Sequence, residues 1–147
     1  MQGSEDDRGG ATKKREPLGA MTLYPMAESV SRARRWFRKF IEPHQPMCPL
    51  DDCVLMISEL VTNAILYGKA DEEWLVRVEW WRERGSLRVD VHNPGFPANV
   101  RLREPTADEA HGRGLCLVNA LSDSWYAGPS SYGGTVVSFV VEKAWPA

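Results

Sequence analysis

The spacing of apolar residues changes from a helical period to a period of two between residues 65 and 74, and this change constrains the fold most. Upstream of it, residues 28–41 and 51–68 carry apolar side chains three and four positions apart, and a segment with three prolines connects them. Downstream, residues 74–81 and 87–92 alternate between two faces on either side of a turn at Arg84 and Gly85. These periods predict two amphipathic helices followed by an antiparallel hairpin.

The rest of the chain adds a loop, a short helix and two strands. Residues 93–114 lose periodicity and collect prolines, glycines and charges, which indicates a long loop of the kind that often forms a lid. Residues 115–121 predict a short helix, and residues 124–127 and 135–141 predict strands. Because there is no regular β-α-β alternation, we expect an α+β domain. Its architecture should be a two-layer α/β sandwich, with helices on one face of a mixed, mostly antiparallel sheet.

The ends of these segments carry further signals. We expect Asp51 or Asp52 to cap the second helix and Gly68 to end it. Residues 1–20 are rich in glycine and charge, so we expect a disordered tail, either a solvated terminus or a docking arm. The folded domain should then span residues 21–147.

The composition excludes several classes of protein. A chain of 147 residues with 43% hydrophobic residues can bury a core, and a net charge of −2 gives no reason to expect nucleic acid or an anionic membrane as a partner. The cysteines Cys48, Cys53 and Cys116 are odd in number and form no C-x-x-C pair, which argues against a disulfide framework and a zinc knuckle. No apolar run approaches the roughly 20 residues of a membrane helix, and the N-terminus lacks the apolar region of a signal peptide. We therefore expect a cytoplasmic protein.

The first helix has a basic face that admits two interpretations. It is either a solvated surface or a contact for an acidic partner or nucleic acid. Its residues are Arg32, Arg35 and Lys39.

Two polar residues of the second helix could converge on one ligand. Glu59 and Asn63 are four positions apart and therefore share one helix face. An amide oxygen is a hard ligand suited to Mg²⁺, and a carboxylate can accept a proton from a hydroxyl group. Both residues could equally be ordinary exposed helix positions, so their spacing alone does not decide the question.

The start of the short helix is a candidate phosphate site. Gly112 and Gly114 leave the backbone N–H groups approachable at the positive end of a helix, where phosphates bind. The P-loop pattern is absent from the chain, and the third glycine of a dinucleotide fingerprint is missing after Leu115. The sequence is thus neither a P-loop nor a Rossmann protein.

Other candidate ligands lie around the same loop. The cations available to a phosphate site are Arg101, Arg103 and Arg113, and Arg113 is the best placed of them. His92 and His111 flank the loop, but two histidines without a third ligand at a recognisable spacing do not make a metal site.

Four segments bring these residues together in a fixed order. They are SELVTNA (58–64), VDVHNPGFP (89–97), HGRGLCLV (111–118) and GGTV (133–136). In this combination the sequence resembles the ATPase domain shared by gyrase, Hsp90, histidine kinases and MutL. Within that family it is most similar to the bacterial anti-sigma-factor serine kinases and their actinobacterial relatives. The resemblance covers roughly residues 22–142, and it implies the Bergerat-type fold with ATP and Mg²⁺ as ligands.

The resemblance also implies a role for each matching residue. Asn63 is similar to the magnesium-ligating asparagine of the family, and Glu59 to its general base. Asn93 stands where the family commonly has an aspartate that receives the adenine amino group. The remaining matches are the first glycine of the second segment, the phosphate-loop residues and the threonine near the adenine: Gly95, Gly112, Arg113, Gly114, Leu115 and Thr135.

Three positions depart from the family pattern. Asn93 replaces the usual aspartate, and its neutral carbonyl should accept a hydrogen bond more weakly than a carboxylate. Pro97 stands where a second glycine is often found and stiffens the start of the loop. Tyr67 replaces a histidine that is frequent after the asparagine, with no consequence that we can derive.

Three functions follow as hypotheses. The leading one is a serine/threonine protein kinase that sequesters a sigma factor or other transcription regulator and phosphorylates a small antagonist protein. The second is a non-catalytic module in which ATP orders a surface for a regulator. The third, the catalytic part of a histidine kinase, is weaker because no helix-borne acceptor histidine precedes the domain and His44 lies between prolines. Relatives often form homodimers, which is implied by the resemblance only.

Overall fold

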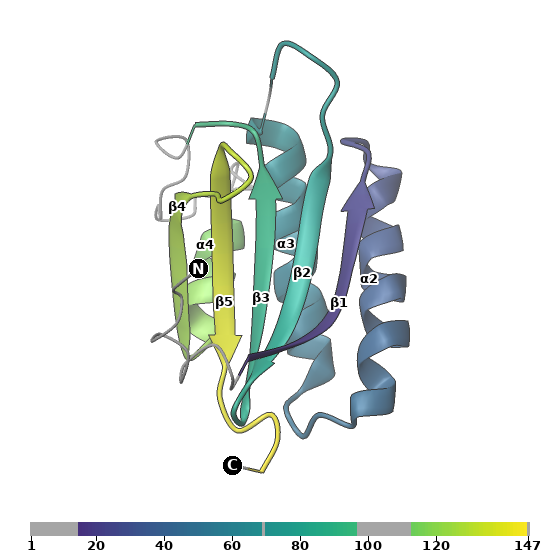
Figure 1. Ribbon diagram of the computed structural model, residues 1–147, viewed down its shortest axis with the longest axis vertical. Coiled ribbons are helices and arrows are strands. Elements are labelled where there is room, and N and C mark those ends of the chain that lie inside the picture. Colours follow the sequence, from purple (N-terminus) through teal and green to yellow (C-terminus); the bar gives the residue numbers. More distant parts are fainter. Residues whose placement is uncertain (1–14, 69, 97–112, 147) are drawn as a thin grey trace, which may run out of the picture.

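The computed structural model describes residues 15–68, 70–96 and 113–146. The elements in these ranges mix strands and helices along the chain (Figure 1). They are β1 (Arg15–Leu23), α2 (Glu28–Ile41), the 3-10 turn η1 (Glu42–His44), α3 (Leu50–Tyr67), β2 (Val76–Glu83), β3 (Ser86–Asn93), α4 (Arg113–Leu121), β4 (Ser124–Pro129) and β5 (Thr135–Val141). Among the described helices, none has the length and apolar character needed to cross a membrane.

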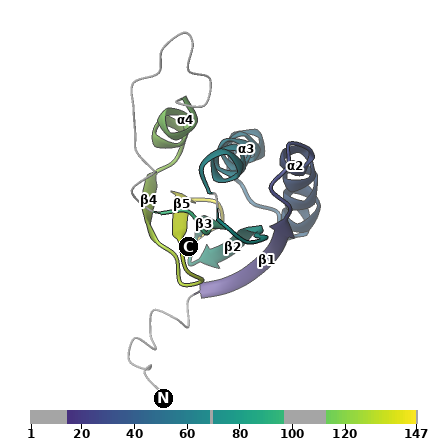
Figure 2. The ribbon, with the colours of Figure 1, turned by 90° about the horizontal axis from the view of Figure 1, so that it is seen from above.

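The strands form one sheet in the order β1-β2-β3-β5-β4, and every neighbouring pair is antiparallel. Figure 2 shows α2, α3 and α4 along the same face of this sheet. The expected α+β sandwich is therefore confirmed. Within the described residues the sheet is wholly antiparallel and contains no parallel pair.

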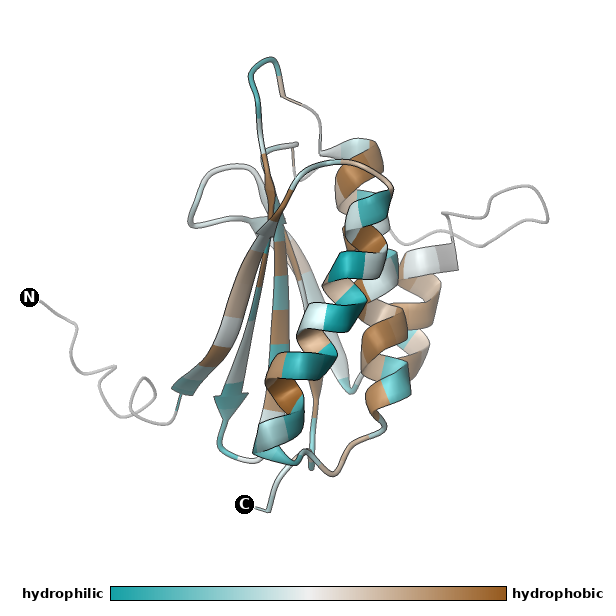
Figure 3. Ribbon diagram, turned by 90° about the vertical axis from the view of Figure 1, so that its right-hand side faces the viewer, coloured by the Kyte–Doolittle hydropathy of each residue, from teal (hydrophilic) through white to brown (hydrophobic). Residues whose placement is uncertain are grey.

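The core lies between the sheet and the helix layer. Phe37 of α2 meets Trp80 of β2 edge to face, with ring centroids 5.4 Å apart, and both side chains are fully buried. The alternation of hydrophobic and hydrophilic residues along the strands and helices can be followed in Figure 3. The other fully buried side chains of the same core cluster include Ile41, Met56, Ile57, Val61, Val76, Val78, Leu87, Val89 and Phe139.

Strand β1 corrects the expected boundary of the N-terminal tail. Residues 15–20, which we assigned to the tail, pair with β2 at the edge of the sheet. The register shifts between Pro17 and Gly19, and proline is tolerated on an edge strand because the ladder there is one-sided. A methyl group at Gly19 would lie 2.5 Å from Cζ2 of Trp80, so only glycine lets the strand pass over this indole ring. Residues 1–14 lie outside the described part of the chain.

Helix α3 begins differently from our expectation and ends as expected. Its N-cap residue is Pro49, and no side chain caps it. Asp51 and Asp52 lie in the first turn, where carboxylates still interact favourably with the positive helix end, and Asp51 forms an ion pair with Arg38 of α2. Gly68 ends the helix, and its N–H donates to the carbonyl of Ala64 at 2.9 Å.

Candidate functional site

The face of α3 that carries Glu59 and Asn63 meets the start of α4. Both side chains are half-buried. A methyl group at Gly114 would lie 3.0 Å from Asn63 Nδ2 and 3.1 Å from Glu59 Oε1. The structure therefore brings Gly114 next to two residues that lie more than 50 positions earlier in the chain. Because glycine has no side chain, the backbone of α4 can approach Glu59 and Asn63 closely.

The first turn of α4 adds hydrogen-bond donors to this contact. The helix begins at Arg113, so the N–H groups of its first residues have no acceptor within the helix. The side chain of Leu115 is 5% exposed and belongs to the hydrophobic core. Leu115 is therefore positioned to offer its backbone N–H, not its side chain, to a ligand.

A second group of predicted site residues gathers where β3 ends and β5 begins. Asn93 and Thr135 are cross-strand partners, and both are buried. The N–H of Gly95 donates to Asn93 Oδ1 at 2.8 Å, and the hydroxyl of Thr135 donates to the carbonyl of Gly95 at 2.6 Å. Because a backbone N–H can only donate, the atom facing Gly95 must be the oxygen of the Asn93 amide.

Two glycines that sequence reasoning left out of the site hold this second group in place. A methyl group at Gly68 would lie 2.7 Å from Cβ and Cγ of Asn93, and one at Gly134 would lie 2.2 Å from the Asn93 carbonyl oxygen. Gly134 also has a positive φ of 87°. The sequence marked both positions, because Gly68 ends the helix and Gly134 directly precedes Thr135. Their shared contact with Asn93 depends on the fold and could not be predicted from these positions.

Helix α3 joins the two groups into one site. Asn63 is five residues before Gly68, which corresponds to roughly 7–8 Å along a helix axis. The carbonyl of Tyr67 also borders Gly95, since a methyl group there would lie 2.7 Å from it. One end of the site thus offers a carboxylate, an amide and helix N–H groups, and the other end offers a buried amide and hydroxyl.

Several predicted residues fall outside what the structure describes. They are Pro97, Arg101, Arg103, His111 and Gly112, which lie in residues 97–112. Arg113 starts α4, but only its backbone is described. Their roles stay predictions.

The residues of the first group fit a magnesium ion. Glu59 and Asn63 supply a carboxylate and an amide oxygen on adjacent turns of one helix, which are the hard donors that Mg²⁺ takes alongside waters and substrate phosphates. Their spacing of four residues places both side chains on one side of α3, and Gly114 packs closely against both.

A separate cluster of charged residues lies on the other face of the sheet. Val78 and Trp80 face the helices, so Glu79 between them points away from the helices. Glu79, Asp90 and His92 are all buried, and their potential ligand atoms lie within 4.8 Å of one another. Arginines already engage both carboxylates: Arg77 Nε lies 2.8 Å from Glu79, and Arg88 Nε lies 2.9 Å from Asp90.

Burial and hydrogen bonds within this cluster shift the pKa values of His92 and Glu79. Burial lowers the pKa of His92, whose ring nitrogens lie 2.7 Å from Ser130 Oγ and 3.2 Å from Glu79 Oε1. Burial also acts to raise the pKa of Glu79, but hydrogen bonds from Tyr132 and Arg77 bring that pKa below its ordinary value. The cluster is a charge-balanced network that ties β2 and β3 to the β4–β5 turn.

Comparison with known proteins agrees with the observed fold. The histidine kinase-like ATPase domain matches residues 24–141, which include α2 through β5. No curated protein matches the chain closely enough to serve as a relative. The match supports ATP binding and a regulatory role for the domain. The chain therefore belongs to the family of histidine kinase-like ATPase domains.

Proposed function

We propose that this chain is a serine/threonine protein kinase of the anti-sigma-factor type. It uses Mg-ATP to phosphorylate a small antagonist protein, and it sequesters a sigma factor or another transcription regulator in the cytoplasm. The observation that carries the proposal is the contact of Glu59 and Asn63 with Gly114 at the start of α4.

Each residue has a defined task in the proposed reaction. Glu59 accepts the proton of the serine hydroxyl that attacks the terminal phosphate. The N–H groups in the first turn of α4 stabilise the charge that develops on the phosphate oxygens. Asn63 would hold the magnesium ion, which neutralises phosphate charge when bound.

The second group of residues would hold the base of ATP. Asn93 Oδ1 has one lone pair engaged by Gly95 and keeps a second for the adenine amino group. Thr135 fixes the Gly95 backbone through its hydroxyl, so it acts by positioning the glycine next to the base.

The decisive experiment recovers binding partners from cells and incubates each with labelled Mg-ATP and the purified full chain. We expect phosphate on a serine or threonine of one partner, and loss of this transfer in Glu59→Gln and Asn63→Ala. The matched control is Glu72→Gln, which makes the same change at an exposed loop position. Absence of transfer to every partner that binds would overturn the kinase.

A non-catalytic binding module is the second candidate, and one observation favours it. Asn93 is neutral where the family commonly has a carboxylate, and its oxygen already bonds to Gly95. In this alternative, ATP binding alone prepares a surface for a regulator, without phosphoryl transfer. A Glu59→Gln variant that binds ATP and regulates its partner normally would support the module over the kinase.

The histidine-kinase alternative gains no support from the described residues. His44 ends the 3-10 turn η1, which precedes α3. Asn63 lies thirteen positions after Leu50 in α3, which is roughly 20 Å along the helix axis. His44 is therefore far from the place where the proposal puts the transferred phosphate.

A further inference from the structure

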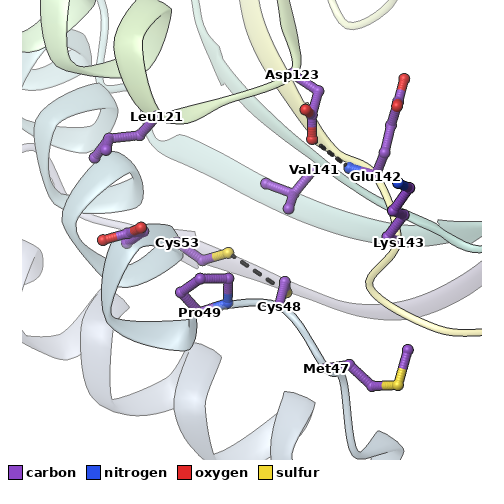
Figure 4. A pocket seen from close by; sticks show the side chains of 10 residues that line it. Met47, Cys48, Pro49, Cys53, Leu121, Asp123, Val141, Glu142 and Lys143 are labelled. Carbon is purple, nitrogen blue, oxygen red and sulfur yellow. Dashed lines mark hydrogen bonds between the residues drawn. The ribbon is translucent and has the colours of Figure 1, made fainter.

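Two cysteines meet at the end of α3 that is remote from the ATP site. Cys48 lies two residues before α3, and Cys53 lies in its first turns. Their Sγ atoms are 4.0 Å apart and share a hydrogen bond, drawn as a dashed line in Figure 4. Both side chains are buried, with Cys48 9% exposed and Cys53 fully buried. The pair is free thiol in this structure.

The two thiols border a pocket of about 310 Å³ (Figure 4). Its walls come from three parts of the chain that meet here, namely the start of α3 with the residues before it, the end of α4 with the residues after it, and the end of β5 with the residues after it. The pocket is lined on one side by Met47 and Pro49 and on another by Leu121 and Val141. A small solute in this pocket would lie beside Cys48, which is 9% exposed, whereas Cys53 is fully buried.

The pair divides the roles of nucleophile and proton donor. The hydrogen bond between the two thiols lowers the pKa of Cys48, and the same bond together with burial raises the pKa of Cys53. Cys48 also lies beside the positive end of α3, which favours a thiolate. Cys48 is thus the reactive sulfur, and Cys53 is held next to it.

We propose that Cys48 and Cys53 form a reversible oxidation site for small hydroperoxides, in which Cys48 is the peroxidatic sulfur and Cys53 the resolving sulfur. The proposal is independent of the kinase reaction. It also differs from a structural disulfide framework, because the two thiols close a ring of only a few residues and the fold is complete while they are reduced.

The chemistry balances in two steps. In the first, the Cys48 thiolate attacks one oxygen of the hydroperoxide, the O–O bond breaks, and an alcohol or water leaves with a proton; Cys48 becomes a sulfenic acid. In the second, the Cys53 sulfur attacks Cys48 Sγ, the S–O bond breaks, and water leaves with the Cys53 proton. The two sulfurs together lose two electrons, which reduce the peroxide.

The geometry requires only a local adjustment for the second step. The sulfurs must close from 4.0 Å to roughly 2.05 Å. Cys48 belongs to the connection before α3, whereas Cys53 is fixed within the helix by the bond from its N–H to the Pro49 carbonyl at 3.3 Å. We therefore expect Cys48 to make most of the movement.

The test treats the reduced full-length chain with hydrogen peroxide and identifies the products by intact mass and peptide mapping. We expect loss of two hydrogens, a cross-linked peptide that joins Cys48 to Cys53, and restoration by dithiothreitol. Cys116 of α4 should stay open to alkylation. Two alkylatable thiols at positions 48 and 53 after treatment, or a cross-link that includes Cys116, would overturn the proposal.

Three variants assign the roles of the sulfurs. Cys53→Ser should stop at a sulfenic acid on Cys48, which dimedone traps, and Cys48→Ser should abolish the cross-link without sulfenic acid at Cys53. Cys116→Ser is the matched control and should form the cross-link as the parent does. Sulfenic acid at Cys53 in the Cys48→Ser chain would reverse the assignment. Peptide mapping of the parent protein tests the cross-link even where a variant fails to fold.

Discussion

Replacing Asn93 by aspartate should strengthen ATP binding. In the present structure the amide oxygen of Asn93 accepts the N–H of Gly95 at 2.8 Å, so the other branch of the side chain is an NH₂ group that can only donate. In the proposed binding mode the adenine amino group, which is also a donor, would share this oxygen with Gly95. The substitution Asn93→Asp turns the second branch into an acceptor with the same shape.

The expected gain follows from the kind of hydrogen bond that forms. A bond to a charged acceptor contributes about 1.5–3 kcal/mol, compared with about 1 kcal/mol for a neutral pair. Because Asn93 is only 8% exposed, desolvation of the new carboxylate removes part of this gain. We expect the free energy of ATP binding to become more favourable by about 1–2 kcal/mol, which is roughly a 5- to 30-fold decrease in the Kd for ATP.

Isothermal titration of the purified chain with Mg-ATP measures this change directly. Asn119→Asp is the matched control, because it adds the same charge at an exposed position of α4, where the side-chain oxygen still accepts from Trp125 Nε1. Its Kd should equal that of the parent. An Asn93→Asp protein that is folded by circular dichroism, yet binds ATP no more tightly than the parent, would refute the placement of the base at Asn93.

Three further predictions concern the ATP site, the charged cluster and the core. Gly114→Ala places a methyl group 3.0 Å from the nearest atom of the α3 site face, and the resulting overpacking of about 1–3 kcal/mol should weaken ATP binding in the same titration at least several-fold. Burial lowers the pKa of His92 in the fold, so the unfolded chain takes up the proton first, and the free energy of unfolding should decrease as the pH falls below about 6.5. Denaturant titrations at three pH values should show this dependence of the free energy of unfolding on pH. His92→Gln should make the dependence weaker between pH 6.5 and 5, a range that lies above the titration of Glu79, whose pKa is lowered. Phe37→Ala removes a fully buried ring that packs on Trp80, and urea denaturation should show a loss of about 3–5 kcal/mol; a loss below 1 kcal/mol would contradict the placement of this ring in the core.

The amphipathic segments could be predicted from the sequence with accurate bounds. The expected first helix, residues 28–41, and last strand, residues 135–141, agree with α2 and β5. Their periodicity is local, since each segment must turn one apolar face toward a core wherever that core lies. The same reasoning paired β2 with β3, because a short turn leaves adjacent strands few alternatives.

Strand β1 could not be predicted in this way. Its sequence contains Pro17 and Gly19 and has little alternation, so its local preference for a strand is weak. It forms because β2 offers an open edge and because Gly19 fits against the ring of Trp80. Both partners are more than 50 residues away, and no local pattern contains them.

The residues of the candidate site also differ in how far the sequence could predict them. Sequence alone determined that Glu59 and Asn63 share a helix face, because four residues make about one turn, and the order of the four segments indicated which family the chain resembles. Only the tertiary structure decided that Gly114 closes on both side chains, that Gly68 and Gly134 pack around Asn93, and that the Asn93 oxygen is engaged by Gly95. These contacts join elements that are remote in the chain, and their distances depend on how α3, α4 and the sheet pack together, which no spacing along the sequence specifies.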